Sequence, residues 1–139
     1  MGGKLLTFLI IGSSILFGAL LFYFQVFAYY YRVSGIDQIS VDDKIISVTG
    51  YQGVDAESSG LKLRGCFFTN PEDFSELKQK NNPTPLSAPF WFDCFDHSDL
   101  QKDLDNDLAT AYIASKEDKP GMDRIVAVYP DGRSYQWRQ

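Results

Sequence analysis

Two cysteines and a single histidine are the residues whose types and spacing suggest chemistry. Cys66 and Cys94 are the only cysteines in the chain, and His97 follows Cys94 at the third position. Each cysteine lies among aromatic residues, and no Cys-x-x-Cys motif of the redox type is present. We therefore expect a structural Cys66–Cys94 disulfide, which would contribute about 3–4 kcal/mol by closing a loop of about 28 residues.

A pair of reduced, buried thiols in a cytoplasmic domain is one alternative for the cysteines, and metal binding or thiol chemistry is another. Cys66, Cys94 and His97 could supply three soft ligands, with Met122 as a fourth, and such ligands suit zinc or copper. A lone histidine near a helix start is more often a surface or capping residue, and haem attachment would need Cys-x-x-Cys-His. We expect no metal site and no cofactor.

A run of aspartates invites a calcium interpretation. Its members are Asp93, Asp96, Asp99, Asp103, Asp105 and Asp107. The last three match the first half of an EF-hand loop, yet Leu108 replaces the glycine at position six and Ala114 replaces the glutamate at position twelve. The pattern favours a solvated acidic helix instead.

The charge balance and the absence of catalytic motifs narrow the classes of function. Lys4 and Arg32 are the only charged residues before residue 34, so residues 34–139 carry 11 basic and 18 acidic side chains, a net charge of −7. This excludes the basic surface that nucleic-acid binding requires. Nucleophile elbows, P-loops, dinucleotide fingerprints and kinase motifs are absent. We expect a protein that is not an enzyme.

The N-terminal segment has the properties of a membrane anchor. Leu5–Ala28 comprises 24 uncharged residues. As a helix it would span about 36 Å, enough for a hydrocarbon core of about 30 Å. We assign residues 1–31 to a single transmembrane anchor. A signal peptide cleaved after Val26-Phe27-Ala28 is the alternative, although the apolar run exceeds the usual length of about 7–15 residues.

Charge and cysteine usage indicate the orientation of the anchor. The amino terminus and Lys4 precede the span, whereas Arg32 follows it, which leaves a weak positive-inside bias. A disulfide belongs to an oxidising compartment. We expect a cytoplasmic N-terminus and an exported C-terminal domain.

Aromatic residues crowd the far end of the span, where rings sit among lipid headgroups. The residues that we assign to this contact with the lipid bilayer are Phe27, Tyr29, Tyr30 and Tyr31.

Small and polar residues form one stripe within the span. Thr7, Ser14, Gly18 and Gln25 recur at spacings of 7, 4 and 7. Ser14 and Gly18 make a small-xxx-small pair, which lets helix backbones approach closely in lipid. The stripe is a candidate packing face for an integral membrane protein complex. Alternatively, the hydroxyls bond their own helix backbone and Gln25 reaches the membrane interface.

The rest of the chain indicates a linker at 32–43 and an α+β domain at 44–139. The clearest element is a β-hairpin, in which alternating apolar residues at 124–129 and 133–138 flank the turn Pro130-Asp131-Gly132. The expected architecture is a small antiparallel sheet with two short helices on one face.

The other expected elements follow from strand alternation and helix caps. We predict strands at 44–51 and 61–68, a helix at 70–80 starting at Asn70-Pro71, and an acidic helix capped by Asp96 or Ser98 that buries Leu100 and Leu104. Residues 108–114 fit either a third strand or an extension of the acidic helix.

Three stretches resemble a known family when they are read together. They are residues 51–67 (YQGVDAESSGLKLRGCF), 88–96 (APFWFDCFD) and 123–139 (DRIVAVYPDGRSYQWRQ). With an anchor that ends in Phe-Gln-Val-Phe-Ala-Tyr-Tyr, they resemble uncharacterised small single-pass proteins of unknown function from alphaproteobacteria. Members are sometimes labelled histidine kinase, but this chain is too short for a kinase core. The resemblance implies a bacterial inner-membrane anchor and a periplasmic domain, and no activity.

Two functions from different classes are consistent with these features. The first is a non-catalytic accessory subunit or assembly factor of an inner-membrane complex; a respiratory or photosynthetic complex is suggested only by the type of organism. The alternative is a periplasmic thiol- or copper-handling factor that uses Cys66, Cys94 and His97.

Overall fold

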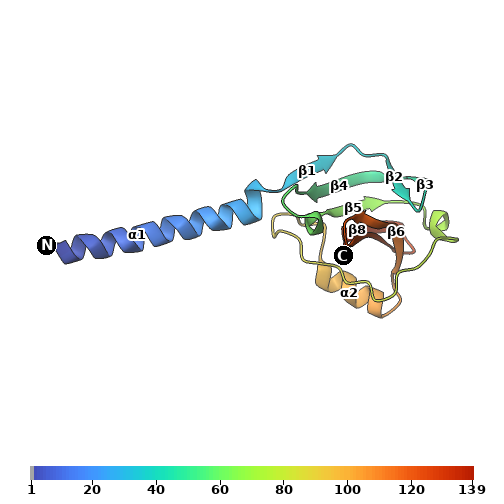
Figure 1. The fold of residues 1–139 in the computed structure, drawn as a ribbon. Helices are drawn as coiled ribbons and strands as arrows, with labels where there is room; N and C mark the ends of the chain where they lie inside the picture. Colours follow the sequence, from blue (N-terminus) through green and yellow to red (C-terminus); the bar gives the residue numbers. More distant parts are fainter. Residues whose placement is uncertain (1) are drawn as a thin grey trace.

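A long N-terminal helix projects from the rest of the chain in the computed structural model, which describes residues 2–139 (Figure 1). Helix α1 (Gly2–Tyr23) runs directly into a π-helical turn, η1 (Phe24–Ala28). An 18-residue window of Gly2–Ala28 has a mean hydropathy of 2.4, and none of it is buried. The helix is therefore long and apolar enough to cross a membrane, a property that a signal sequence shares.

Six antiparallel strands form the main sheet, in the order β1-β4-β5-β8-β7-β6. Their bounds are β1 Tyr31–Ser34, β4 Thr49–Asp55, β5 Arg64–Phe68, β8 Arg133–Arg138, β7 Met122–Val128 and β6 Thr110–Lys119. A separate hairpin consists of β2 (Gln38–Val41) and β3 (Lys44–Ser47). The α+β architecture predicted from the sequence is confirmed.

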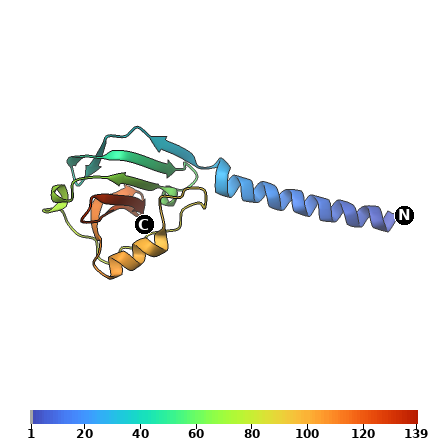
Figure 2. The same cartoon turned by 180° about the vertical axis from the view of Figure 1, so that it is seen from behind.

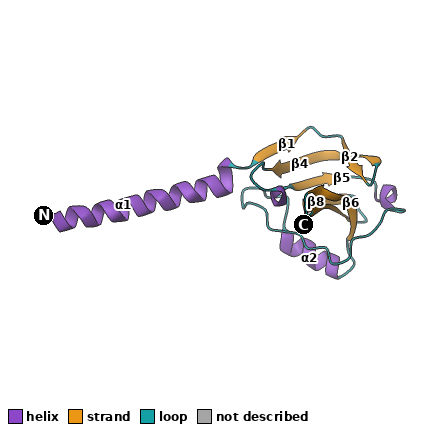
Figure 3. Cartoon of the chain, in the orientation of Figure 1, coloured by secondary structure: helices purple, strands orange, loops and turns teal. Residues whose placement is uncertain are grey.

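The two faces of the sheet carry separate hydrophobic cores. Helix α2 (His97–Asp105) and the irregular segment before it cover one face, and the β2–β3 hairpin covers the other (Figures 1 and 3). The α2 side buries Phe92, Phe95, Leu100, Leu104 and Trp137, and the hairpin side buries Ile39, Ile46, Tyr51, Phe74 and Val126. Seen from behind, α1 leaves the domain at the end opposite the β2–β3 hairpin (Figure 2).

The segment 32–43 is not the linker that the sequence suggested. It contains most of β1 and all of β2, and Tyr31 already pairs with Asp55 of β4. Asp42 and Asp43 both have positive φ, +47° and +65°, which allows a two-residue turn between β2 and β3. The sheet therefore starts where the helix ends.

The strand predicted at 44–51 is two strands that belong to different sheets. β3 ends at Ser47 and β4 begins at Thr49. Val48 between them is buried, and its N–H donates to the Asp37 carbonyl over 2.9 Å. This contact turns the chain from the small hairpin into the main sheet.

The helix predicted at 70–80 is wrong beyond its first turn. Asn70 caps it as expected, but only the 3₁₀ turn η3 (Pro71–Phe74) forms. Residues 78–80 pair instead with the edge strand β6, where Lys80 N–H donates to Ala111 and Ile113 N–H to Lys78. Covering a sheet edge satisfies backbone groups that a short helix would leave unpaired. The domain therefore has one α-helix rather than two.

The strand predicted at 61–68 begins only at Arg64, because Gly60–Lys62 form the 3₁₀ turn η2. The other predicted elements are confirmed. Helix α2 is capped by Asp96, which accepts from two backbone N–H groups, and it buries Leu100 and Leu104. Residues 108–114 contribute to a strand, β6, rather than to a longer helix. The β7–β8 hairpin turns at Gly132 with φ +95°, where a Cβ would lie 2.7 Å from the Thr69 carbonyl oxygen.

Charged side chains link the last three strands. Arg138 Nε donates to Asp118 Oδ2 over 2.7 Å, and Arg124 Nε lies 3.6 Å from Asp118 Oδ1. Burial by itself would raise the pKa of Asp118, but the hydrogen bond from Arg138 and the charge of Arg124 lower it overall. The Asp118 carboxylate therefore joins β6 to β7 and β8.

We predict that Asp118→Asn lowers the free energy of unfolding by about 1–3 kcal/mol at neutral pH. The folded pKa of Asp118 lies below its unfolded value of about 3.9, so its contribution is present above that value and lost as the pH falls through the folded pKa. Urea unfolding followed by tryptophan fluorescence should show a deficit that shrinks toward a pH of about 2. The exposed Asp93→Asn is the control, and a deficit equal at both pH values would contradict the prediction.

Candidate functional site

The helix meets the domain at a cluster of aromatic and basic side chains, which we call the aromatic collar. It is built from the end of η1, the start of β1, the 3₁₀ turn η2 (Gly60–Lys62) and the segment before α2. Its members are Phe27, Tyr30, Arg32, Lys62, Phe90 and Trp91.

Trp91 lies at the centre of the aromatic collar. Its Nε1 donates to the Val26 carbonyl over 2.8 Å. Its ring stacks on Phe27, with centroids 6.0 Å apart, and meets Tyr30 edge-on at 5.8 Å. The Arg32 guanidinium lies 4.7 Å from the Trp91 ring centroid. Because the last carbonyls of a helix lack intrahelical donors, the indole both satisfies the helix end and fixes the domain to it.

Phe90 and Lys62 form the outer part of the aromatic collar. Phe90 is 69% exposed, yet its ring meets Phe27 edge-on with centroids 5.7 Å apart. Lys62 Nζ lies 5.0 Å from the ring centroid of Tyr30, a cation–π contact. A hollow of about 280 Å³ lies among four of the collar residues.

The sequence of the preceding segment explains why Trp91 faces the helix. Proline at 83, 85 and 89 prevents regular strand or helix pairing. A turn in which Phe92 N–H donates to the Pro89 carbonyl over 2.9 Å follows, and Phe92 is buried in the α2-side core. With Phe92 inside and Phe90 outside, Trp91 lies sideways toward η1.

Arg64 holds the two domain segments of the aromatic collar together. This residue of β5 is 4% exposed, and its Nε and Nη2 donate to the carbonyls of Leu86 and Ser87, each over 3.0 Å. Its Nη1 donates to the carbonyls of Leu61 and Leu63. Burial lowers the pKa of Arg64 to about 10, so it stays charged at neutral pH. One guanidinium thus fixes both η2 and the segment that carries Trp91.

We predict that Arg64→Met lowers the free energy of unfolding by about 2–4 kcal/mol, since four carbonyls lose their donor. Arg64→Lys should restore only part of this, because an ammonium cannot reproduce the planar fork of a guanidinium. The measurement is urea unfolding of the full chain in detergent. Arg133→Met, at a side chain that is 48% exposed, is the control and should cost less than about 1 kcal/mol. Equal losses at the two positions would contradict this role.

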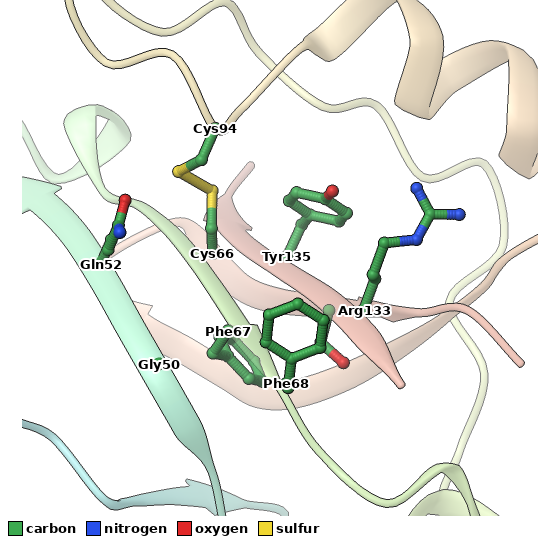
Figure 4. Close-up of a pocket in the computed structure, with 9 residues that line it drawn as sticks. Gly50, Gln52, Cys66, Phe67, Phe68, Cys94, Arg133 and Tyr135 are labelled. Carbon is green, nitrogen blue, oxygen red and sulfur yellow. A yellow bond between two sulfur atoms is a disulfide. The ribbon is translucent and has the colours of Figure 1, made fainter. Parts of the chain in front are cut away.

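The predicted cysteine pair lies beside the aromatic collar segment. Cys66 lies in β5 and Cys94 just before α2, and their sulfurs lie at disulfide distance (Figure 4). A hollow of about 150 Å³ adjoins the two sulfurs, with Phe68 and Tyr135 among the residues that line it (Figure 4). The bond ties the irregular segment to the centre of the sheet.

We predict that replacing Cys66 and Cys94 together by alanine lowers the free energy of unfolding by about 2–5 kcal/mol. Alkylation trapping in intact cells, followed by mass spectrometry, should find both cysteines protected from the alkylating reagent until a reductant is added. Two freely alkylated thiols in the trapped protein would contradict the disulfide.

His97 and the aspartates do not converge on one point. His97 is exposed at the first residue of α2. Asp103 accepts a hydrogen bond from the Tyr129 hydroxyl, and Asp105 accepts one from Gln101. Within residues 2–139, no three His, Cys, Asp or Glu side chains are grouped as metal ligands.

The predicted packing stripe lies on α1 and η1, in which no residue is buried. Thr7 Oγ1 donates to the Gly3 carbonyl over 2.9 Å, and Ser14 Oγ donates to the Ile10 carbonyl over 2.8 Å. Apart from its chain neighbours and the backbone of its own helix, Gly18 has no atom within 4 Å of the position that a Cβ would take. Gln25 lies in the π-helical turn η1. The hydroxyls are thus satisfied internally, while the helix surface remains open.

The four aromatics assigned to the membrane interface occupy different environments. Phe27 and Tyr30 belong to the aromatic collar, whereas Tyr29 is 51% exposed and Tyr31, in β1, is 49% exposed. The sequence did not indicate that Phe90 and Trp91 contact the helix end, nor that Arg64 holds the segment that carries them. Only the proline-rich Pro83–Pro89 segment leading into three successive aromatics signalled an unusual surface.

The profile of a family of unknown function (DUF6446) matches residues 34–139. The chain belongs to this family. No curated protein and no solved structure matches the chain. The DUF6446 region begins at the last residue of β1, so it covers nearly all of the sheet domain and leaves out the helix.

Proposed function

We propose that this DUF6446 protein is a non-catalytic accessory subunit or assembly factor of an integral inner-membrane complex, anchored by a single transmembrane helix. In this proposal the N-terminus is cytoplasmic and the sheet domain is periplasmic. A respiratory or photosynthetic complex is the suggested partner, and that suggestion rests on the resemblance to alphaproteobacterial proteins.

The observation that carries the proposal is the attachment of the domain to the last turn of the helix. Trp91 contacts Val26 by a hydrogen bond and Phe27 by stacking. Cleavage after Ala28 would remove both partners, which supports an anchor that is retained. Because the domain is fixed to the helix, one partner protein can contact both the helix and the sheet domain, as we expect for an accessory subunit.

The open surface of the helix supports a membrane partner. Its side chains are exposed from Gly2 to Gln25, including Phe8, Ile15 and Phe17 at 68–73%. Such a surface needs lipid or another apolar helix around it. The cysteine pair at disulfide distance indicates an oxidising compartment, which supports a periplasmic domain.

The alternative, a thiol- or copper-handling factor, has less support. Cys66 and Cys94 are engaged with each other, and His97 lies exposed on α2. Neither residue of the pair is a free thiol.

We predict that Gly18→Leu releases the protein from its complex. A leucine fills the space where two helix backbones would approach, while no atom of the chain itself lies near enough to be displaced. The measurement is purification of the tagged full chain in mild detergent, with quantitative mass spectrometry of the co-purifying proteins. Partners should fall to the level of an untagged strain.

The matched control is Leu20→Ile, which changes shape little at a side chain that is 46% exposed. Both variants should insert equally well, because leucine and isoleucine suit hydrocarbon. Retention of every partner by Gly18→Leu would contradict recognition through this face. Co-purification of no membrane protein with the parent chain would contradict the accessory role itself.

A further inference from the structure

We propose that the aromatic collar is a binding site for the phospholipid headgroup layer of the membrane that the helix crosses. Phe90 enters the boundary between headgroups and acyl chains, and Arg32 and Lys62 contact lipid phosphates. The inference rests on the proposed membrane anchoring but not on a partner complex.

The position of Phe90 carries the first part of this inference. Phe90 lies far along the sequence from the helix, yet its ring touches Phe27 of η1 and is 69% exposed. A large aromatic ring at the end of a membrane-spanning helix lies at the depth where aromatic side chains are most favourable. The domain therefore adds its own apolar anchor to those of the helix.

The charges around Phe90 carry the second part. Arg32 lies over the Trp91 ring and Lys62 over the Tyr30 ring. Within residues 2–139, neither cation lies within 4.0 Å of a carboxylate oxygen. Arg32 and Lys62 lie over aromatic rings at one end of the domain, whereas residues 34–139 as a whole carry a net charge of −7. These two cations match anionic phosphates, which attract basic residues close to the membrane surface.

The acidic groups nearby do not cancel these two cations. Asp55 lies next to Tyr31 but is 3.4 Å from Arg138, which balances its charge. The charge of Asp55, and more weakly that of Glu57, raises the pKa of Tyr31, and within residues 2–139 Glu57 forms no ion pair with Arg32 or Lys62. The aspartates between residues 93 and 107 lie just before α2, within it or just after it.

The continuity of the aromatic collar with the helix favours lipid over a protein as the occupant. The collar begins at the last turn of the apolar helix, so the headgroup layer reaches it without any further partner. Attachment at both the helix and Phe90 would hold the domain in one orientation on the membrane. The opposite end, with the β2–β3 hairpin, would then point away from the bilayer (Figures 1 and 2).

The test places an environment-sensitive probe at each end of the domain in the full chain. Phe90→Cys and the matched Phe68→Cys, at a ring that is 53% exposed at the far end of β5, are labelled with NBD-maleimide under non-reducing conditions. The proteins are placed in nanodiscs of phosphatidylcholine alone, or with about 30% phosphatidylglycerol. Quenching by lipids with a doxyl group near the top of the acyl chain is then measured.

We expect several-fold stronger quenching at position 90 than at position 68, and an increase at position 90 with phosphatidylglycerol. Arg32→Gln together with Lys62→Gln should abolish that increase, whereas Lys44→Gln in β3 should leave it unchanged. Equal quenching at the two positions would overturn the insertion of Phe90. If quenching at position 90 changes neither with phosphatidylglycerol nor with the substitution of Arg32 and Lys62, the phosphate site is overturned. No partner protein is present, so either failure is distinct from failure of the accessory role.

Discussion

The hydrogen bond from the Trp91 indole to the Val26 carbonyl is the contact on which the arrangement of helix and domain depends. It joins residues that are 65 positions apart in the sequence. A helix end offers carbonyls without donors, and an indole offers a donor on a large apolar ring, so one side chain satisfies both needs. Together with the stacking of Trp91 and the edge contact of Phe90 on Phe27, it fixes the domain to the helix in addition to the backbone that leads into β1.

Two independent contacts of the domain fix the position of the segment that carries Trp91. Arg64 binds the carbonyls of Leu86 and Ser87 just upstream, and the Cys66–Cys94 bond holds the chain just downstream. Both Arg64 and Cys66 belong to β5, a central strand of the sheet. The irregular segment is thus fixed at two points to a strand inside the sheet, which is how a loop can hold a side chain such as Trp91 in place.

Local patterns in the sequence predicted the elements that local chemistry determines. The turn residues of the β7–β8 hairpin and the Asp96 cap of α2 act within a few positions, so their effects can be read directly. The helix at 70–80 failed because residues 78–80 pair with β6, a strand that lies about thirty residues further along, and pairing of that kind has no local signal. The linker prediction for 32–43 failed although Gln38–Val41 alternates polar and apolar residues, with Ile39 and Val41 buried, which is itself a strand pattern. Trp91 and Arg64 were missed for the same reason as residues 78–80, since their partners are distant in sequence.

The place of β8 in the sheet has a consequence for biosynthesis. β8 pairs with both β5 and β7, and its residues follow α2, β6 and β7 in the chain. During translation β5 therefore has an open edge until almost the whole domain has been made, and the sheet cannot close as it emerges. The sulfurs of Cys66 and Cys94 both emerge before β8, so covalent attachment of the irregular segment can precede closure of the sheet. A domain built in this order needs protection from pairing with other chains until β8 covers the open edge of β5.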